Sequence, residues 1–380
     1  MLDLIAIRRE LHRIPELAFE EHKTSGKLLD TVTALTAGRD DVEVVRYRTG
    51  IIVHVPATAP VPDGAARKTI GWRADMDAMP IAERTGLPFA SAHAGAMHAC
   101  GHDVHMACGL GILERIRARP QHSDFVFLFQ PAEENISGAQ QIYDAGLLDA
   151  YGISELYALH VSPEWDAGVI ATRPGPLLAG SSGVYVEFTG VPGHAAMPHR
   201  AVDPIVSVAS FVLQIQAMVA RNFDPAVGGV VLTFGTISGG TVVNGVARSA
   251  KVMGTLRFLT ADQHDLAFRR IREIAAGVAT ATGATVDVEL TDTPWVPVIN
   301  DPEITAKFTD HLRSRPETTA EDAPVTMASE DFGYLLSRIP GMMFWLGTGK
   351  GAPLHSDTFN PDETAIAPAA ALIADYLSQV

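Results

Sequence analysis

The densest group of side chains that could bind a metal lies at residues 97–105, which read MHACGHDVH. Cys100 and His102 are two positions apart, and Gly101 between them allows a tight turn. A thiolate and an imidazole at this spacing can reach the same metal ion, and both are good ligands for transition metals. Taken alone, the segment fits a loop with a buried free cysteine and surface histidines equally well.

A pair of adjacent glutamates, Glu133 and Glu134, closely follows an apolar run at residues 125–129. Such a run is typical of a strand that is buried on both faces. Open α/β sheets place their binding sites at the carboxyl ends of strands. One carboxylate of the pair can bind a cation while its neighbour moves protons. A solvated acidic pair in a loop is the alternative, but this position in the chain favours a functional role.

Two more histidines and an aspartate follow predicted strands. His160 ends a strand at residues 155–160, and His355 comes after a strand at 342–346 and a glycine-rich turn. Asp75 follows a strand at 69–74 and could orient a ligand histidine, although a turn or capping role explains it equally well. We therefore expect one sheet edge to gather a set of metal ligands: Cys100, His102, one of the two glutamates, His160 and His355.

The elements that must position these residues alternate between helix and strand patterns. Helical patterns cover residues 3–35, 103–118 and about 137–145, and they recur at 302–314 and from about 364. Alternating helices and strands predict an α/β layer fold around a largely parallel sheet.

The middle of the chain has a different pattern, with strands and helices in the order β-α-β-β-α-β. Its two helices have clear start signals: Asp203 with Pro204, and Thr260 with Gln263 three positions later. The order is that of the ferredoxin-like split unit. We therefore predict an inserted domain at residues 180–292 and a catalytic domain formed by residues 1–179 and 293–380.

The composition limits the classes of partner. The chain has 380 residues, 47% of them hydrophobic, and a formal net charge of −15. An acidic surface disfavours binding to nucleic acid or to anionic membranes. Two cysteines do not form a disulfide framework, the charged N-terminus does not resemble a signal peptide, and we find no stretch of about 18 apolar residues. We expect a soluble cytoplasmic protein.

Read as a set, the motifs resemble those of the M20 metallopeptidase and amidohydrolase family. The match is best to its aminoacylase-like branch, which includes hippurate hydrolases, auxin-conjugate hydrolases and N-acetyl-diaminopimelate deacetylases. The resemblance covers nearly the whole chain and is carried by residues 73–80 (RADMDAMP), 98–103 (HACGHD), 130–134 (QPAEE), 159–160 (LH), 193–199 (GHAAMPH), 329–332 (SEDF) and 354–356 (LHS). It implies a catalytic domain of the zinc-peptidase type with an inserted lid and dimerisation domain.

The resemblance also implies a set of roles around two divalent ions. Arg73 stands where the wider family has a metal-binding histidine, and in this branch the Cys-Gly-His segment compensates. The implied ligands are Cys100, His102, Glu134, His160 and His355, and Glu133 is the implied general base. Zinc, manganese, cobalt or nickel could each occupy such mixed sulfur, nitrogen and oxygen sites.

For the inserted domain, the resemblance implies that His194 reaches the active site of a partner subunit and polarises the scissile carbonyl. It also implies that Asn244 and Arg257 bind the substrate carboxylate. The expected assembly is a homodimer or a larger homo-oligomer. The expected reaction is hydrolysis of an N-acyl or N-aroyl amino acid by a metal-activated water.

Three other functions are weighed against this one. A dipeptidase or carboxypeptidase of the same family, acting on short peptides, has the same ligands. A non-catalytic binding relative is expected to lose a ligand or the base, and this chain keeps both. A serine hydrolase would use residues 180–183 (GSSG) or Ser238, but neither matches Gly-x-Ser-x-Gly at a strand-to-helix turn.

Overall fold

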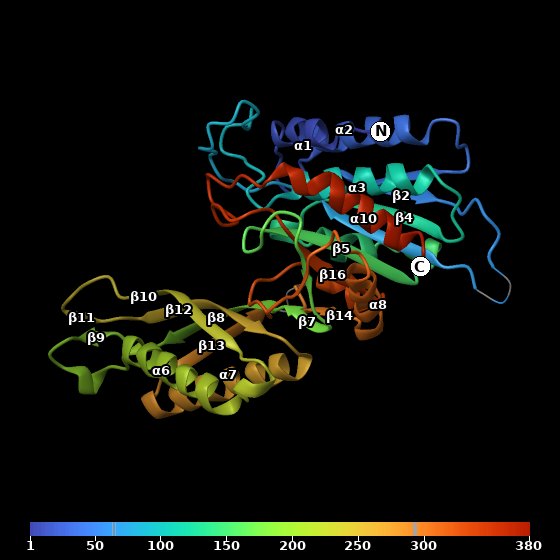
Figure 1. The fold of residues 1–380 in the computed structure, drawn as a ribbon. Coiled ribbons are helices and arrows are strands. Elements are labelled where there is room, and N and C mark those ends of the chain that lie inside the picture. The colour runs from blue at the N-terminus through green and yellow to red at the C-terminus, as the bar shows by residue number, and fades with distance from the viewer. Residues whose placement is uncertain (63, 65, 292–294) are drawn as a thin grey trace. The chain divides into compact units, whose positions relative to one another are not determined.

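The computed structural model describes residues 1–62, 64, 66–291 and 295–380 and divides the chain into two compact units (Figure 1). Unit 1 consists of Met1–Leu177, Val298–Pro324 and Asp331–Val380, and unit 2 of Leu178–Pro297 and Val325–Glu330. Each unit is built around its own hydrophobic core. The inserted domain expected at residues 180–292 starts within unit 2, and its expected end at residue 292 lies outside the described residues.

Unit 1 is built on an eight-stranded sheet in the order β1-β2-β4-β3-β5-β16-β6-β15. Its strands are β1 (Glu43–Tyr47), β2 (Gly50–Val55), β3 (Thr69–Asp75), β4 (Asp124–Gln130), β5 (Glu155–Ser162), β6 (Ile170–Thr172), β15 (Ala320–Asp322) and β16 (Gly341–Gly347). The central strands β4, β3, β5 and β16 are mutually parallel, whereas β1 and β2 are antiparallel at one edge. The α/β fold with a largely parallel sheet is therefore confirmed.

The central strands form the sheet because they are apolar on both faces. Every residue of β3, β5 and β16 is buried, and so is β4 from Phe125 onward. A strand covered on both sides loses the polar alternation of a half-exposed strand. Two further strands, β7 (Gly175–Leu178) and β14 (Val298–Asn300), pair with each other outside this sheet.

Helices cover the sheet of unit 1. They are α1 (Leu4–His12), α2 (His22–Thr36), α3 (His102–Arg117), α4 (Glu133–Ile136), α5 (Gly138–Asp144), α8 (Pro302–Arg313), α9 (Phe332–Leu336) and α10 (Ile366–Leu377). α3 lies at the centre of one layer, where it packs against α1, α2, α10 and the sheet (Figure 1). A side chain at Gly111 would approach Leu4 to 2.5 Å, so this glycine lets α1 pack closely on α3.

Unit 2 has the predicted β-α-β-β-α-β order. Its elements are β8 (Gly180–Thr189), α6 (Pro204–Asn222), β10 (Val231–Gly239), β12 (Ser249–Phe258), α7 (Ala261–Thr282) and β13 (Thr285–Thr291). The four strands form an antiparallel sheet in the order β10-β12-β8-β13. Two short strands, β9 (Gly193–His194) and β11 (Gly245–Val246), pair beside it. The predicted caps are present: the side chains of Asp203 and Thr260 accept backbone N–H groups at the starts of α6 and α7.

Two expectations about helices need correction. The helical pattern predicted over residues 3–35 is two helices, because the chain turns between His12 and His22 at Pro15 and at Phe19, whose φ is 61°. Contrary to our expectation of no such segment, α6 is long and apolar enough to cross a membrane by length and composition alone. It buries Val208 and Phe211 in the core of unit 2.

Candidate metal centre

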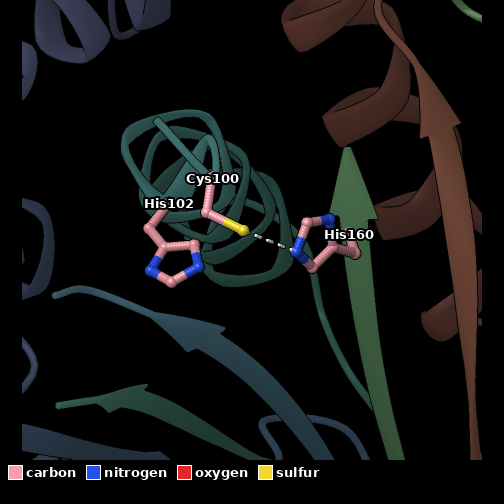
Figure 2. A group of neighbouring side chains, drawn as sticks. All are labelled: Cys100, His102 and His160. Carbon is pink, nitrogen blue, oxygen red and sulfur yellow. Dashed lines mark hydrogen bonds between the residues drawn. The ribbon is translucent and has the colours of Figure 1, made fainter. Parts of the chain in front are cut away.

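The candidate ligands of unit 1 come together where α3 begins, beside the carboxyl-terminal part of β5. Gly101 precedes α3 with a φ of 84°, and a Cβ there would lie 2.3 Å from Val161. Only glycine fits this turn, which places Cys100 and His102 on the two sides of the start of the helix. Figure 2 shows the side chains of Cys100 and His160 meeting, with His102 next to them.

Cys100 is the centre of the group. Its Sγ lies 3.3 Å from Nε2 of His160 and 3.4 Å from Nε2 of His355. Two sets of potential ligand atoms share this sulfur, each with all of its atoms within 4.8 Å of one another: Cys100, His102 and His160, and Cys100, Glu134 and His355. The structure therefore brings all five predicted ligands into two adjacent sets joined by one thiol.

The ligand histidines are oriented by main-chain carbonyls. Nδ1 of His102 donates to the carbonyl of Asp77 at 2.8 Å, and Nδ1 of His160 donates to that of Val161 at 2.7 Å. In both rings Nε2 is the atom that faces the group. Nε2 of His102 is buried and has no hydrogen-bond partner among the described residues. A buried ring nitrogen aimed at a thiol and carboxylates is what a metal ligand needs before the ion binds.

The charges around His102 favour a cation. Burial alone would lower the pKa of His102, but the carboxylates of Asp75, Asp77 and Glu134 outweigh it and raise the pKa to about 10. The protein without metal therefore holds a proton here, which a divalent ion would replace. Burial lowers the pKa of His160 well below its ordinary value, so this imidazole is neutral and its Nε2 can bind a metal.

Glu133 and Glu134 begin the one-turn helix α4, next to His102. His102, Glu133 and Glu134 also form a group with ligand atoms within 4.8 Å of one another. Glu133 is 6% exposed, and its carboxylate accepts the backbone N–H of Asp331 at 3.4 Å. The base candidate is thus held within reach of the same small volume as the ligands.

Asp75 lies at this edge as expected, but its closest partners are not the predicted ligands. Its Oδ1 accepts from Nδ1 of His105 at 2.5 Å and its Oδ2 from Arg73 at 2.6 Å, while Nε2 of His102 is 3.7 Å away. His105 in turn accepts the backbone N–H of Val161 through Nε2 at 2.9 Å. Asp75 therefore fixes His105, and His105 fixes the strand that carries His160.

Arg73 fills the place of the missing histidine with a buried charge. It is 1% exposed, and its guanidinium donates to Gln130 at 2.8 Å, to Asp75 at 2.6 Å and to Asp331 at 2.8 Å. A buried guanidinium is tolerated when its N–H groups are paired with acceptors. Sequence reasoning singled out Arg73 only as a departure, and it quoted Gln130 and Asp331 within motifs without giving them the role of partners to this guanidinium. The alternation of one arginine and two aspartates at residues 73–77 was the available signal.

The candidate residues of unit 2 lie in two places. His194 in β9 pairs with Gly245 in β11, and the carbonyl of Asn244 accepts from the N–H of Ala195 at 3.1 Å. His194 and Asn244 are therefore neighbours, and both are exposed. Arg257 lies near the far end of β12 from Ser249, is half-buried, and donates to Ser329 at 2.5 Å.

The serines of the serine-hydrolase alternative lie within strands. Ser181 and Ser182 belong to β8 and Ser238 to β10. None of the three lies at a strand-to-helix turn, the position that a nucleophilic serine occupies in α/β-hydrolases. The geometry therefore gives this alternative no support.

Comparisons with known proteins place the chain among metallopeptidases and deacetylases, which fits a metal centre in unit 1. The family model described as peptidase family M20/M25/M40 matches residues 71–379. The chain is 44% identical to an N-acetyldiaminopimelate deacetylase of Streptococcus thermophilus (strain CNRZ 1066) over 376 residues, 99% of this chain and 98% of the relative. It is also 44% identical to an N-acetyldiaminopimelate deacetylase of Streptococcus sanguinis (strain SK36) over 378 residues, again 99% and 98%.

A solved structure points in the same direction. The Bacillus subtilis YXEP protein, described as a dinuclear metal binding peptidase from the M20 family, superposes with a TM-score of 0.85 at 28% identity. The superposition covers 99% of this chain and 97% of that one.

Proposed function

The chain belongs to peptidase family M20/M25/M40, and on that premise we propose that it removes the acyl group from N-acyl amino acids. It is a hydrolase of amide bonds, as its deacetylase relatives are. The observation that carries the proposal is the pair of ligand sets that share Cys100, with Glu133 beside them. Because the 44% identical relatives are N-acetyldiaminopimelate deacetylases, N-acetyl-diaminopimelate is the first substrate to test.

The residues fit two divalent ions. Cys100, His102 and His160 would hold one, and Cys100, Glu134 and His355 the other, with the thiolate shared. Thiolate and imidazole ligands suit zinc, cobalt and nickel, whereas manganese is better matched to oxygen ligands such as Glu134. When bound, such ions supply Lewis-acid activation of water and of the scissile carbonyl.

Glu133 is the proposed general base. It would take the proton from the attacking water and return it to the leaving nitrogen, so that the amine departs as a neutral group. Its 6% exposure keeps bulk water from competing for that proton. Glu134, one residue later, takes the ligand role, so adjacent carboxylates divide the two tasks.

His194 is the proposed donor to the oxyanion. Its Nδ1 accepts the backbone N–H of Ala196 at 3.1 Å, so in the neutral ring Nε2 carries the proton. That N–H is exposed and ready to donate to the charge that develops on the scissile carbonyl oxygen.

The geometry of unit 2 favours a site shared between two subunits. Ser249 and Arg257 stand eight residues apart on β12, which is roughly 26 Å at the rise of a strand. β9 and β11 lie next to the Ser249 end of that strand: β11 precedes Ser249 in the chain, and β9 follows Thr189, the last residue of β8, which pairs with Ser249. A two-residue substrate spans only about 7 Å. One chain therefore does not bring His194 and Arg257 to the same substrate, and we propose that a partner subunit supplies His194 and Asn244.

Unit 2 carries surfaces that suit a homodimer. β10 is an edge strand of its sheet, and Ile237 on it is 63% exposed. Leu213 on α6 is 73% exposed. An uncovered edge with exposed apolar neighbours is a surface that another chain can cover. We propose a homodimer or larger homo-oligomer in the cytoplasm, where the two free cysteines stay reduced.

A dipeptidase or carboxypeptidase activity is the second candidate, because the B. subtilis neighbour is described as a peptidase. A panel of substrates separates the two. The enzyme loaded with zinc, manganese, cobalt or nickel is given N-acetyl-diaminopimelate, N-acetyl, N-benzoyl and indole-acetyl amino acids, and dipeptides. We expect kcat/KM to be highest on an N-acyl amino acid. Faster cleavage of dipeptides would favour the peptidase, and no release of free amino acid from any compound would contradict both.

A further inference from the structure

The side chain of Asp77 accepts hydrogen bonds from the backbone N–H groups of Glu133 and Glu134. Oδ1 accepts the N–H of Glu133 at 3.0 Å, and Oδ2 accepts the N–H of Glu134 at 3.1 Å. Asp77 is 0% exposed. The first amides of a helix need acceptors from outside it, and Ala132, which precedes α4, has no side chain that could serve. Asp77, more than fifty residues earlier in the chain, caps this helix instead.

The main chain of Asp77 holds a third functional residue. Its carbonyl accepts Nδ1 of His102 at 2.8 Å, and the same Nδ1 is 3.4 Å from Oδ1 of its carboxylate. This contact turns Nε2 of His102 toward the group of ligands. One buried residue therefore touches the proposed base, Glu133, and one proposed ligand from each of the two sets, His102 and Glu134.

The backbone around α4, which Asp77 stabilises, has an unfavourable conformation at both of its ends. Ala132 and Ser137, on either side of α4, have φ values of 59° and 50°, a left-handed conformation that disfavours residues with a side chain. A second buried carboxylate, that of Glu21, accepts the N–H of Ala132 at 3.0 Å. Three consecutive amides, from Ala132 to Glu134, are thus held by two carboxylates from distant parts of the chain.

We propose that Asp77, assisted by Glu21, is a positioning residue that fixes the base Glu133 and the ligands Glu134 and His102 before metal binds. The inference rests on the proposed function, because it takes these three residues to be the base and two ligands. Asp77 contacts the backbone of Glu133 and Glu134 and the Nδ1 side of the His102 ring, which faces away from the group of ligands. It therefore acts through these three residues rather than on the substrate. Backbone partners that orient ligands in this way contribute to metal affinity.

Asp77→Asn tests the proposal with a minimal change. The amide keeps one acceptor oxygen but turns the other into an NH2 group, which cannot accept an N–H. Asp301→Asn is the control for loss of a carboxylate at a helix start, because Oδ1 of Asp301 accepts two backbone amides, from Glu303 at 2.9 Å and Ile304 at 3.0 Å, at the start of α8. α8 carries none of the proposed ligands. Each variant is titrated with Co²⁺ and followed by absorption, and kcat and KM are measured on the best substrate.

We expect Asp77→Asn to weaken Co²⁺ binding about 10- to 100-fold and to lower kcat more than it raises KM. Asp301→Asn should change the melting temperature little and leave Co²⁺ affinity within twofold of wild type, because an asparagine oxygen can replace the one oxygen that accepts both amides. Equal Co²⁺ affinity in Asp77→Asn and wild type, or an equal loss in both variants, would overturn the proposal. Co²⁺ binding does not depend on the substrate, so a wrong substrate assignment leaves this result unchanged. Failure of the wild-type protein to bind Co²⁺ would overturn the proposed function and this inference together.

Hydrogen exchange of the wild-type protein supplies a test that does not depend on a variant folding. The proposal requires the amides of residues 132–134 to be held in the metal-free protein. We expect peptides that contain them to exchange slowly before metal is added, and adding Zn²⁺ to change this little. Exchange at the rate of an unprotected chain until metal is added would show that the metal forms the turn, and would contradict preorganisation by Asp77.

Discussion

The two units differ in whether their candidate functional side chains are buried or exposed. Unit 1 buries a connected group of charges at its sheet edge, including Arg73, Asp75, Asp77 and His102. Unit 2 has an apolar core, and its candidate residues His194, in the short strand β9, and Asn244, just before β11, are exposed. Most of the residues that we propose hold a cation are buried among partners, whereas His194 and Asn244, which we propose meet the substrate, are exposed.

The difference has an energetic reason. A buried charge costs several kcal/mol unless partners compensate it, and every charged group of the unit 1 network described above has close partners. These partners fix geometry as well as charge. The described buried polar residues of unit 2 are few, namely Ser182, Ser207, Gln263 and Glu330. Substitutions around the proposed centre of unit 1 should therefore change metal binding, and substitutions of the candidate residues of unit 2 should change turnover or substrate affinity while the metals stay bound.

The largest effect is expected at the base. Glu133→Gln should lower kcat by about 10³-fold or more, because the proton acceptor is lost, while two metal ions per chain remain bound. The adjacent Glu134→Gln should instead weaken metal binding. Steady-state kinetics and metal analysis of the two variants separate the roles. Activity of Glu133→Gln within tenfold of wild type would rule out Glu133 as the base.

The next effect concerns the shared thiol. Cys100→Ser should weaken binding of both ions by about 100-fold, because a neutral hydroxyl is a poor substitute for a thiolate. Cys108→Ala is the matched control in the same helix region, where burial raises the pKa of the thiol to about 12 and keeps it protonated. Zinc titration against a competing chelator measures both variants. Loss of only one ion from Cys100→Ser would contradict a thiol shared by two ions.

A substitution in unit 2 should spare the metals. His194→Ala should lower kcat about 10- to 100-fold by removing an oxyanion donor, with metal content unchanged. If the site is shared between subunits, mixing His194→Ala with Glu133→Gln should restore activity, since one kind of mixed dimer site has both residues intact. The mixed sample is assayed after subunit exchange. Activity no greater than the sum of the two separate variants would show that His194 acts within its own chain.

A smaller effect is expected at Arg257. Arg257→Lys keeps the charge but loses the two-pronged contact with a carboxylate, so KM should rise about tenfold while kcat changes less. A substrate analogue that has an amide in place of the carboxylate should show no difference between the two enzymes. If the amide analogue were affected equally, Arg257 would not be the carboxylate contact.

The smallest effect is a pH dependence of stability in unit 1. Burial would raise the pKa of Glu83, but hydrogen bonds from His12, Thr85 and the N–H of Ser91 outweigh it and lower the pKa to about 2. The contribution of Glu83 to stability is therefore present above pH 4.5 and is lost as the pH falls toward 2. Melting curves of metal-free Glu83→Gln should depend less on pH in this window than those of wild type. Glu289→Gln, on an exposed position of β13, should leave that dependence unchanged.

The sequence predicted correctly those features that depend on residues close together in the chain. The buried strand at 125–129 and the caps at Asp203 and Thr260 are local patterns, and all three are present. Among the candidate ligands, Cys100 and His102 stood out by their spacing in a dense cluster, and the two glutamates, His160 and His355 because each follows a predicted strand; the resemblance then singled out Glu134 as the ligand. The strands β1, β6 and β15 were missed, because β1 and β15 lie at the sheet edges and β6 and β15 have only three residues each.

The supporting residues were missed for a different reason. Asp77, His105 and Gln130 act through contacts with residues between 25 and 57 positions away in the chain. No local pattern reports such contacts. The αL conformation of Ala132 is likewise unexpected from its residue type, because alanine favours it only when distant groups hold it there. The chain therefore reveals which residues do chemistry more readily than which residues hold them in place.

The most direct test of the account is zinc X-ray absorption of the protein loaded with two equivalents of Zn²⁺. The proposed centre predicts a sulfur ligand to both ions at about 2.3 Å, from the one shared thiolate. It also predicts a zinc–zinc distance of about 3.5–4 Å, and the sulfur signal should vanish in Cys100→Ser. Two tightly bound ions without any sulfur ligand, or an unchanged sulfur signal in Cys100→Ser, would contradict the centre described here.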